Sequence, residues 1–300
     1  MTAPDRDPRA RTGLLLGLAA YSFWGLFPVY FVYMRHVPPL EMVSHRVVWS
    51  LLFLLLLTSL RGEWTAVRAA LSERRTFLTL TVTSCLIATN WLVFIYAVET
   101  NEILQSSLGY FITPLVSVLL GRCFLGERLR RGQLVGLILA VCGVALQAAR
   151  FGRFPWIALV LAATFGTYGL LRKTARVEAQ AGLMVETAVA GPLALAYLLW
   201  LRLHGEGSFL AGSLSDDLLL PLAGVITSLP LIAFAAAARR LRLATIGFLQ
   251  YITPTFHFLL AVVFYGEPFT PGHLVSFLCI WAGLACYSVD ALRAAPRFSD

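Results

Sequence analysis

Apolar residues along this chain gather into long runs that are separated by short polar segments. Ten runs come near the roughly 20 residues that a helix needs to cross the hydrocarbon core of a bilayer. They lie at about 13–33, 41–60, 76–97, 103–124, 132–149, 155–171, 182–201, 217–238, 243–265 and 272–290. The pattern predicts an all-α polytopic membrane protein with ten transmembrane helices.

The chain also contains an internal repeat with an offset of 140 residues. Thirteen of 35 ungapped positions are identical between 112–146, which opens ITPL and carries FLGE, and 252–286, which opens ITPT and carries FYGE. The offset corresponds to five spans, and an odd shift reverses the direction in the membrane. We therefore expect two inverted-topology five-helix repeats at 13–150 and 151–290, with tails at 1–12 and 291–300.

Composition supports the membrane assignment. Hydrophobic residues make up 58% of the 300 residues and charged ones 13%, with a mean hydropathy of +0.76. A water-soluble globule of this composition would lack the polar residues to cover its surface. The net charge of +8 comes from basic residues scattered between apolar runs, so it indicates topology and not a nucleic-acid partner.

The basic residues also predict the orientation. With the N-terminus inside, 19 of the 24 basic residues fall in cytoplasmic segments, four fall in outer segments, and Arg46 lies within a span. By the positive-inside rule, both termini are expected to be cytoplasmic. The first run has no small-residue cleavage site behind it, so we expect a retained first span in a multi-pass protein of the plasma (inner) membrane.

Two prolines occupy equivalent positions near the middle of two spans. Pro114 and Pro254 each remove a backbone hydrogen bond, which frees the carbonyls of Tyr110 and Gln250. A free carbonyl in hydrocarbon is costly unless it lines a cavity or finds a partner. The two helices are therefore predicted to be kinked and to line a pathway, although a neighbouring threonine at each site is an alternative partner for the carbonyl.

Aromatic and amide side chains cluster around these prolines, and they suit a small, moderately polar organic solute better than a bare ion. The candidate substrate-cavity residues are Tyr21, Trp24, Asn90, Trp91, Gln105, Tyr110, Tyr168, Thr227, Gln250, Tyr251 and His257.

Three ionisable residues lie within spans other than those that contain Pro114 and Pro254. His45, Arg46 and Glu186 are candidates for gates or for proton coupling, and His257 is a further proton-carrier candidate. Arg46 and Glu186 are related by the 140-residue offset, so inverted symmetry places them at opposite mouths and predicts no ion pair between them. Snorkelling to the nearer interface is the alternative for each.

Other chemistry is not indicated. The sequence has no Ser/His/Asp set, phosphate loop or metal-ligand spacing, so we predict no enzyme activity, metal or cofactor. The five cysteines are interpreted as small packing residues. Small residues at Gly136, Gly143 and Gly283 suit either a homodimer interface or packing within the bundle.

Several motifs together resemble the RarD family, in the EamA branch of the drug/metabolite transporter superfamily. They are AYSFWGLFPVYF, HRVVWS, NWLVFIYAVE, SSLGYFITPL, FGTYGLLRK, Glu186-Thr187 and AARRLRLATIGFLQYITPT followed by FYGE. The resemblance covers about 13–290 and implies a ten-helix carrier with a solute cavity between its halves. The chain departs from the family pattern at Gln105, where Glu is usual, and at Thr113 and Glu99, where Asn is usual.

These features predict a secondary-active transporter that exports small organic metabolites or drug-like solutes by alternating access, with protons as a candidate coupling ion. A non-transporting membrane sensor or assembly protein is the alternative.

Overall fold

The computed structural model describes residues 8–100, 102–151, 154–260 and 271–293, and every regular element in these ranges is helical. The helices are α1 (Pro8–Tyr33), α2 (Pro39–Arg61), α3 (Trp64–Ser72), α4 (Arg74–Glu99), α5 (Ile103–Leu125), α6 (Arg131–Phe151), α7 (Trp156–Thr174), α8 (Ala179–His204), α9 (Leu214–Ala238), α10 (Leu243–Gln250), α11 (Ile252–Leu259) and α12 (Pro271–Arg293). Each expected span overlaps a helix or, for 243–265, a pair of helices.

Six helical segments in the described ranges are long and apolar enough to cross a membrane. They are Pro8–Tyr33, Pro39–Arg61, Arg74–Ala97, Leu108–Leu125, Ala179–His204 and Leu214–Ala238. In lipid, a helix satisfies its own backbone hydrogen bonds, which is why such runs fold as helices there. The chain is therefore a polytopic helical membrane protein.

Helix α3 was not expected from the sequence. It lies in the connection between the second and third runs, follows the left-handed turn at Gly62 (φ 68°), and buries Val67 and Ala70. Nine residues are too few to cross a bilayer, so a search for spans passes over this helix.

The two proline-containing helices differ in continuity. Helix α5 runs unbroken through Pro114, whereas the corresponding run in the second half is divided into α10 and α11 at Tyr251. Pro254 lies in the first turn of α11 and offers no N–H to the carbonyl of Gln250.

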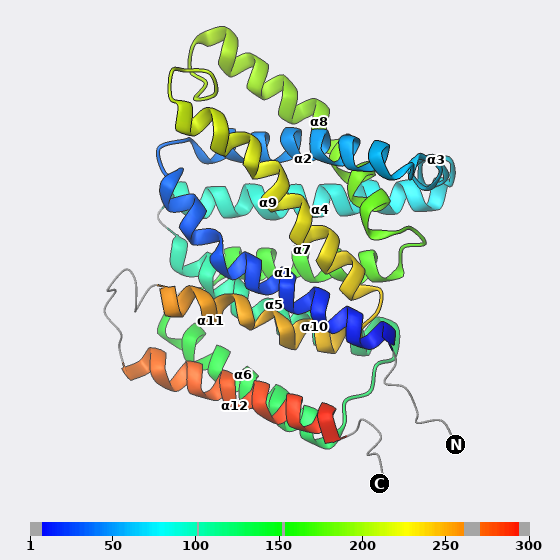
Figure 1. Ribbon diagram of the computed structural model, residues 1–300. Helices are drawn as coiled ribbons and strands as arrows, with labels where there is room; N and C mark the ends of the chain where they lie inside the picture. Colours follow the sequence, from blue (N-terminus) through cyan, green and yellow to red (C-terminus); the bar gives the residue numbers. More distant parts are fainter. Residues whose placement is uncertain (1–7, 101, 152–153, 261–270, 294–300) are drawn as a thin grey trace.

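The helices lie roughly side by side, with α6 and α12 as a pair along one edge (Figure 1). One core of buried side chains is shared by α1, α2, α3, α4, α7, α8, α9 and α10, and a second joins α5, α6, α7, α10 and α12. The start of α1 and the end of α12 lie at the same end of the bundle (Figure 1). At this end, a hollow of about 720 Å³ opens between α1, α2, α8 and α9.

Candidate functional site

Arg46 lies among aromatic rings contributed by other helices. Its Nε donates to the hydroxyl of Thr227 on α9 at 2.9 Å. The guanidinium carbon lies 4.4 Å from the ring centroid of Trp91 on α4, and 5.8 and 5.9 Å from those of Phe31 and Phe27 on α1. These distances are within the range of cation–π attraction, which stabilises a guanidinium in an apolar setting. We call Arg46, Thr227, Trp91, Phe27 and Phe31 the arginine cage.

Tyr110 and His257 form the next group of polar side chains. Their rings meet edge to face with centroids 5.9 Å apart, which joins α5 to α11. His257 Nε2 donates to the carbonyl of Trp24 on α1 at 3.2 Å. Tyr110 is 36% exposed as a residue and lies within electrostatic range of Arg46. The structure thus brings Trp24, Trp91, Tyr110, Thr227 and His257 to one region between helices of both halves.

Two other tyrosines of the expected cavity are packed more tightly than Tyr110. Tyr21 and Tyr168 are each 1% exposed and lie against Phe234 on α9. The Tyr21 hydroxyl is buried without a hydrogen-bond partner, and the Tyr168 hydroxyl donates to Glu186 at 3.3 Å. Aromatic packing therefore fills the space between α1, α7 and α9.

Asn90, Gln250 and Tyr251 are also buried or half-buried, and two of them bind backbone groups. Asn90 donates to the carbonyl of Leu161 and to the hydroxyl of Thr164, both at 2.9 Å, and so ties α4 to α7. The hydroxyl of Tyr251 donates to the carbonyl of Phe111 at 3.3 Å. Gln250 keeps a buried side-chain oxygen without a partner. Gln105 lies on α5, but its side chain is outside the described part of the chain.

Thr113 and Thr253, which precede Pro114 and Pro254, donate to carbonyls other than the two that the proline rings leave without an N–H donor. Thr113 donates to the carbonyl of Gly109 at 2.7 Å, and Thr253 donates to the carbonyl of Tyr21 on α1 at 2.9 Å. The first bond lies within α5 and the second joins α11 to α1, and neither satisfies the carbonyl of Tyr110 or Gln250.

Glu186 belongs to a buried polar centre between α4, α7 and α8. It is 2% exposed and accepts from the hydroxyl of Thr83 at 2.5 Å. Arg172 lies with its Nε 3.6 Å from the same carboxylate oxygen and is 1% exposed. Burial of two opposite charges is tolerated because each compensates for the lost hydration of the other. The ion-pair partner of Glu186 is thus Arg172, at the end of α7, a residue that the basic-residue count places in a cytoplasmic segment.

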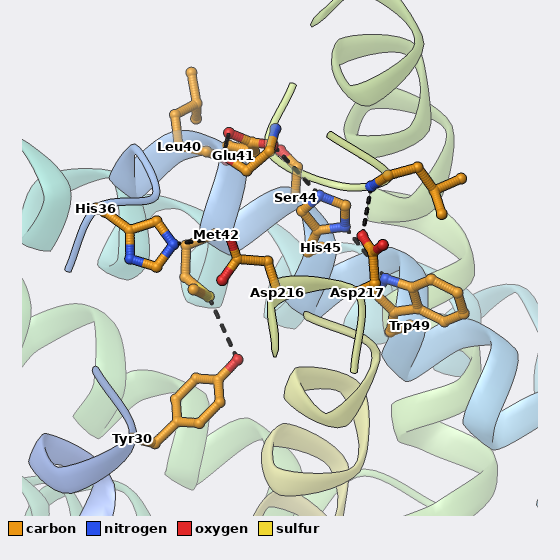
Figure 2. Close-up of polar contacts among 12 residues, drawn as sticks. Tyr30, His36, Leu40, Glu41, Met42, Ser44, His45, Trp49, Asp216 and Asp217 are labelled. Atoms are coloured by element: carbon orange, nitrogen blue, oxygen red, sulfur yellow. Dashed lines mark hydrogen bonds and ion pairs between the residues drawn. The ribbon is translucent and has the colours of Figure 1, made fainter. Parts of the chain in front are cut away.

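His45 belongs to a separate network at the start of α2, which also contains a carboxylate (Figure 2). Glu41 is 1% exposed and accepts from the backbone N–H and the hydroxyl of Ser208, at 2.6 and 3.0 Å. His45 Nε2 lies 3.6 Å from Glu41, and the indole N–H of Trp49 donates to His45 Nδ1 at 3.2 Å. Because Nδ1 accepts this bond, the imidazole proton lies on Nε2, facing Glu41.

Two further contacts hold the same region together (Figure 2). His36 Nε2 lies 3.0 Å from Asp216, and the backbone N–H of Leu210 donates to Asp217 at 2.6 Å. Glu41 thus fastens the segment between α8 and α9 to α2, Asp217 fastens the same segment to α9, and Asp216 joins α9 to the connection between α1 and α2.

Sequence reasoning missed three of these residues. Glu41 is four residues before His45, a spacing that places both on one helix face and could have indicated the pair. Glu127, in the FLGE motif, accepts from the backbone N–H groups of Leu243 and Ala244 at 2.7 and 3.0 Å and so caps α10. Arg172 carries no sequence signal of burial, because it lies beside Lys173 at the end of an apolar run. The FYGE motif of the second copy lies outside the described residues.

Known proteins resemble this chain over nearly its whole length. The model of the EamA-like transporter family matches residues 11–148 and 154–289. Protein RarD of Salmonella typhi is 47% identical over 284 residues, covering 95% of this chain and 97% of that protein. Protein RarD of Escherichia coli is 45% identical over 291 residues, covering 97% and 98%.

Two other matches extend the comparison. An uncharacterized transporter of Vibrio cholerae is 46% identical over 294 residues, covering 98% of this chain and 97% of that protein. A protein crystal structure with 20% sequence identity shares the fold, with a TM-score of 0.74 over 94% of this chain and 99% of the other. Family match, sequence identity and the apolar helices together place the chain in the RarD family of EamA-like membrane transporters.

Proposed function

We propose that this protein is a secondary-active exporter of small organic metabolites or drug-like solutes, and that it works by alternating access. In this proposal ten helices cross the inner membrane, both termini are cytoplasmic, and residues 13–150 and 151–290 are inverted repeats. Two related halves can pack in two ways, each open to one side of the membrane.

The observation that carries the mechanism is the correspondence between the helices of the two halves. Four helices of the second half begin 140 residues after a helix of the first half. These starting residues are Pro39 and Ala179, Arg74 and Leu214, Ile103 and Leu243, and Arg131 and Pro271.

Helix packing supports the same correspondence. When the helices of the first half are matched with those of the second, α1 corresponds to α7, α2 to α8, α4 to α9, and α5 to α10 with α11. The contact of α1 with α9 corresponds to that of α7 with α4, and the contact of α2 with α9 corresponds to that of α8 with α4. A bundle whose contacts repeat in this way is able to exchange the roles of its halves, which is what alternating access requires.

The proposed solute site lies in the region of Trp24, Trp91, Tyr110, Thr227 and His257. Tyr110 supports this placement because the residue is 36% exposed and its ring lies against His257 in an otherwise apolar helix. Gln250 supports it as well, because an amide oxygen that is buried without a partner is free to accept a hydrogen bond.

A counterflow screen in proteoliposomes at two pH values tests the proposal. The panel contains organic acids, amines, neutral metabolites and chloramphenicol, since one relative at 35% identity is named a chloramphenicol-sensitive protein. Tyr110→Ala and Gln250→Ala are expected to slow exchange of the transported solute, whereas Tyr33→Ala, at an exposed ring near the end of α1, is the matched control.

Two results would contradict parts of this proposal. Exchange that is unchanged in both cavity variants would remove the proposed site, and exchange that is independent of pH would remove proton coupling. If no solute exchanges and none alters the labelling of a cysteine placed at Tyr110, the alternative of a sensor or assembly protein replaces transport.

A further inference from the structure

We infer that the solute is an organic anion, and that its carboxylate binds the guanidinium of Arg46 while its apolar body lies against the rings of the arginine cage. This inference rests on the proposed function and specifies its substrate class.

The first argument is the hydrogen-bonding state of Arg46. A guanidinium carries five N–H donors, and only Nε is used here, in the bond to Thr227. Among the described residues, no carboxylate lies within 4.0 Å of this side chain and no other acceptor binds it. Arg46 as a residue is of intermediate exposure, and its terminal nitrogens are not among the described side-chain atoms that are both fully buried and without a hydrogen-bond partner, so a ligand can reach them.

The second argument is a comparison with the other cations in the helices. Arg172 lies against Glu186, and Lys173 donates to the carbonyls of Ala238 and Leu241. An unpaired charge within a membrane span is costly, and such groups are usually compensated by a partner. Arg46 differs from Arg172 and Lys173 in that its described surroundings provide one hydroxyl and several aromatic rings.

The third argument is geometric. Thr227 is 2% exposed and holds one edge of the guanidinium, while Trp91, Phe27 and Phe31 surround it within cation–π distance. A guanidinium held in this way keeps its outer edge for two parallel hydrogen bonds, the geometry that matches a carboxylate. The same rings offer an apolar wall to the rest of the molecule.

The hollow at the end of the bundle where α1 begins provides independent support. Its lining includes four arginines and two glutamates, which are Arg9, Arg61, Arg239, Arg240, Glu63 and Glu178. A concave surface with excess positive charge raises the local concentration of anions and increases their rate of entry. In the proposed topology this hollow opens to the cytoplasm, from which an exporter takes its solute.

Binding of matched probes to the purified protein in nanodiscs of neutral lipid tests the inference. The probes are 3-phenylpropionate and indole-3-acetate, each paired with its uncharged amide, measured by titration calorimetry. The neutral lipid removes anionic headgroups as an alternative source of the anion. The wild type is expected to bind each carboxylate at least about tenfold more tightly than its amide, as expected for a charge-assisted hydrogen bond.

Three variants then test whether Arg46 is the source of the preference for the carboxylate over the amide. Arg46→Gln is expected to abolish the preference for the carboxylate while leaving the affinity for the amide nearly unchanged. Arg46→Lys keeps the charge without the two-bond geometry and is expected to keep part of the preference. Arg35→Gln, an exposed arginine in the connection between α1 and α2, is the matched control and is expected to leave it intact.

The inference is overturned if the wild type binds neither carboxylate, binds carboxylate and amide equally, or keeps its preference in Arg46→Gln. The first two of these outcomes are measured on the wild type alone, so they do not depend on how the variants fold. Counterflow of the same probes separates this inference from the proposed function. If the probes bind in an Arg46-dependent way but are not exchanged, the anion site is supported and transport is contradicted. If neutral or cationic solutes are exchanged without any need for Arg46, transport is supported and the anion site is contradicted.

Discussion

Three carboxylates in this protein each have a different kind of partner. Glu186 faces the guanidinium of Arg172, Glu41 holds the backbone and hydroxyl of Ser208, and Glu127 holds the first N–H groups of α10. In each case the carboxylate joins two helices or a helix and a connection. Single substitutions at these residues therefore test contacts between elements.

Glu186→Gln is expected to lower the free energy of unfolding by about 3–5 kcal/mol, because it leaves Arg172 as a buried charge without a counter-ion. Thermal unfolding in detergent measures the change, and Glu178→Gln, at an exposed carboxylate beside the start of α8, is the control. The double change Glu186→Leu with Arg172→Met is expected to recover most of the loss. If the double variant is as unstable as the single one, uncompensated charge is not the reason.

Glu41→Ala is expected to release the segment between α8 and α9, because both hydrogen bonds to Ser208 are lost. Each bond to a carboxylate is worth about 1.5–3 kcal/mol. Faster proteolysis near Ser208 in limited digestion is the measurement, and Glu206→Ala, an exposed carboxylate of the same segment, is the control. Unchanged cleavage rates would contradict a fastening role for Glu41.

At the scale of elements, the apolar runs determined where most helices lie, but contacts between helices determined their ends and interruptions. At the start of helix α10, the first two backbone N–H groups of the helix donate hydrogen bonds to the carboxylate of Glu127. It ends at Gln250, one turn before the ring of Pro254. The apolar run expected from about 243 predicts where α10 begins but not where it ends, since the run continues through Gln250.

Glu127→Ala is expected to lower stability by about 1–2 kcal/mol, because two N–H groups at the start of α10 lose their acceptor. Glu63→Ala provides a matched control, since Glu63 occupies the N-cap position of α3 without a side-chain hydrogen bond. Thermal unfolding of both variants in detergent is the measurement. An equal loss in the two variants would show that capping by Glu127 is not specific.

The pair formed by α6 and α12 makes a second test at this scale. A Cβ added at Gly136 would lie 2.6 Å from the carbonyl oxygen of Gly283, and one added at Gly283 would lie 2.6 Å from that of Gly136. These glycines therefore pack within the chain. Gly136→Ala is expected to lower stability by about 1–3 kcal/mol through overpacking.

The control for this substitution is Val135→Leu, at a neighbouring exposed position. Light scattering on both variants gives the oligomeric state, which is expected to stay as in the wild type. A change of oligomeric state without a loss of stability would favour the homodimer interpretation of these glycines.

At the scale of the whole molecule, the proposed topology can be tested from both sides of the membrane. In a background without the five native cysteines, an impermeant thiol reagent is expected to reach Ala236→Cys, in the basic hollow, only from the cytoplasmic side. Leu210→Cys, exposed in the α8–α9 connection, is expected to react only from the outside. Labelling of both from one side would contradict the proposed orientation.

The sequence by itself determined the class of protein and the approximate position of its helices, because burial in lipid is read directly from long apolar runs. Its repeat and its motifs also identified the family. Only the tertiary structure decided the partners of the polar groups, because these contacts join residues far apart in the chain. It paired Glu186 with Arg172, left Arg46 among aromatic rings, and assigned Glu127 to the start of another helix. A charge within an apolar run appears the same in sequence whether it is paired, capped or free, and the helix that lies opposite makes the difference.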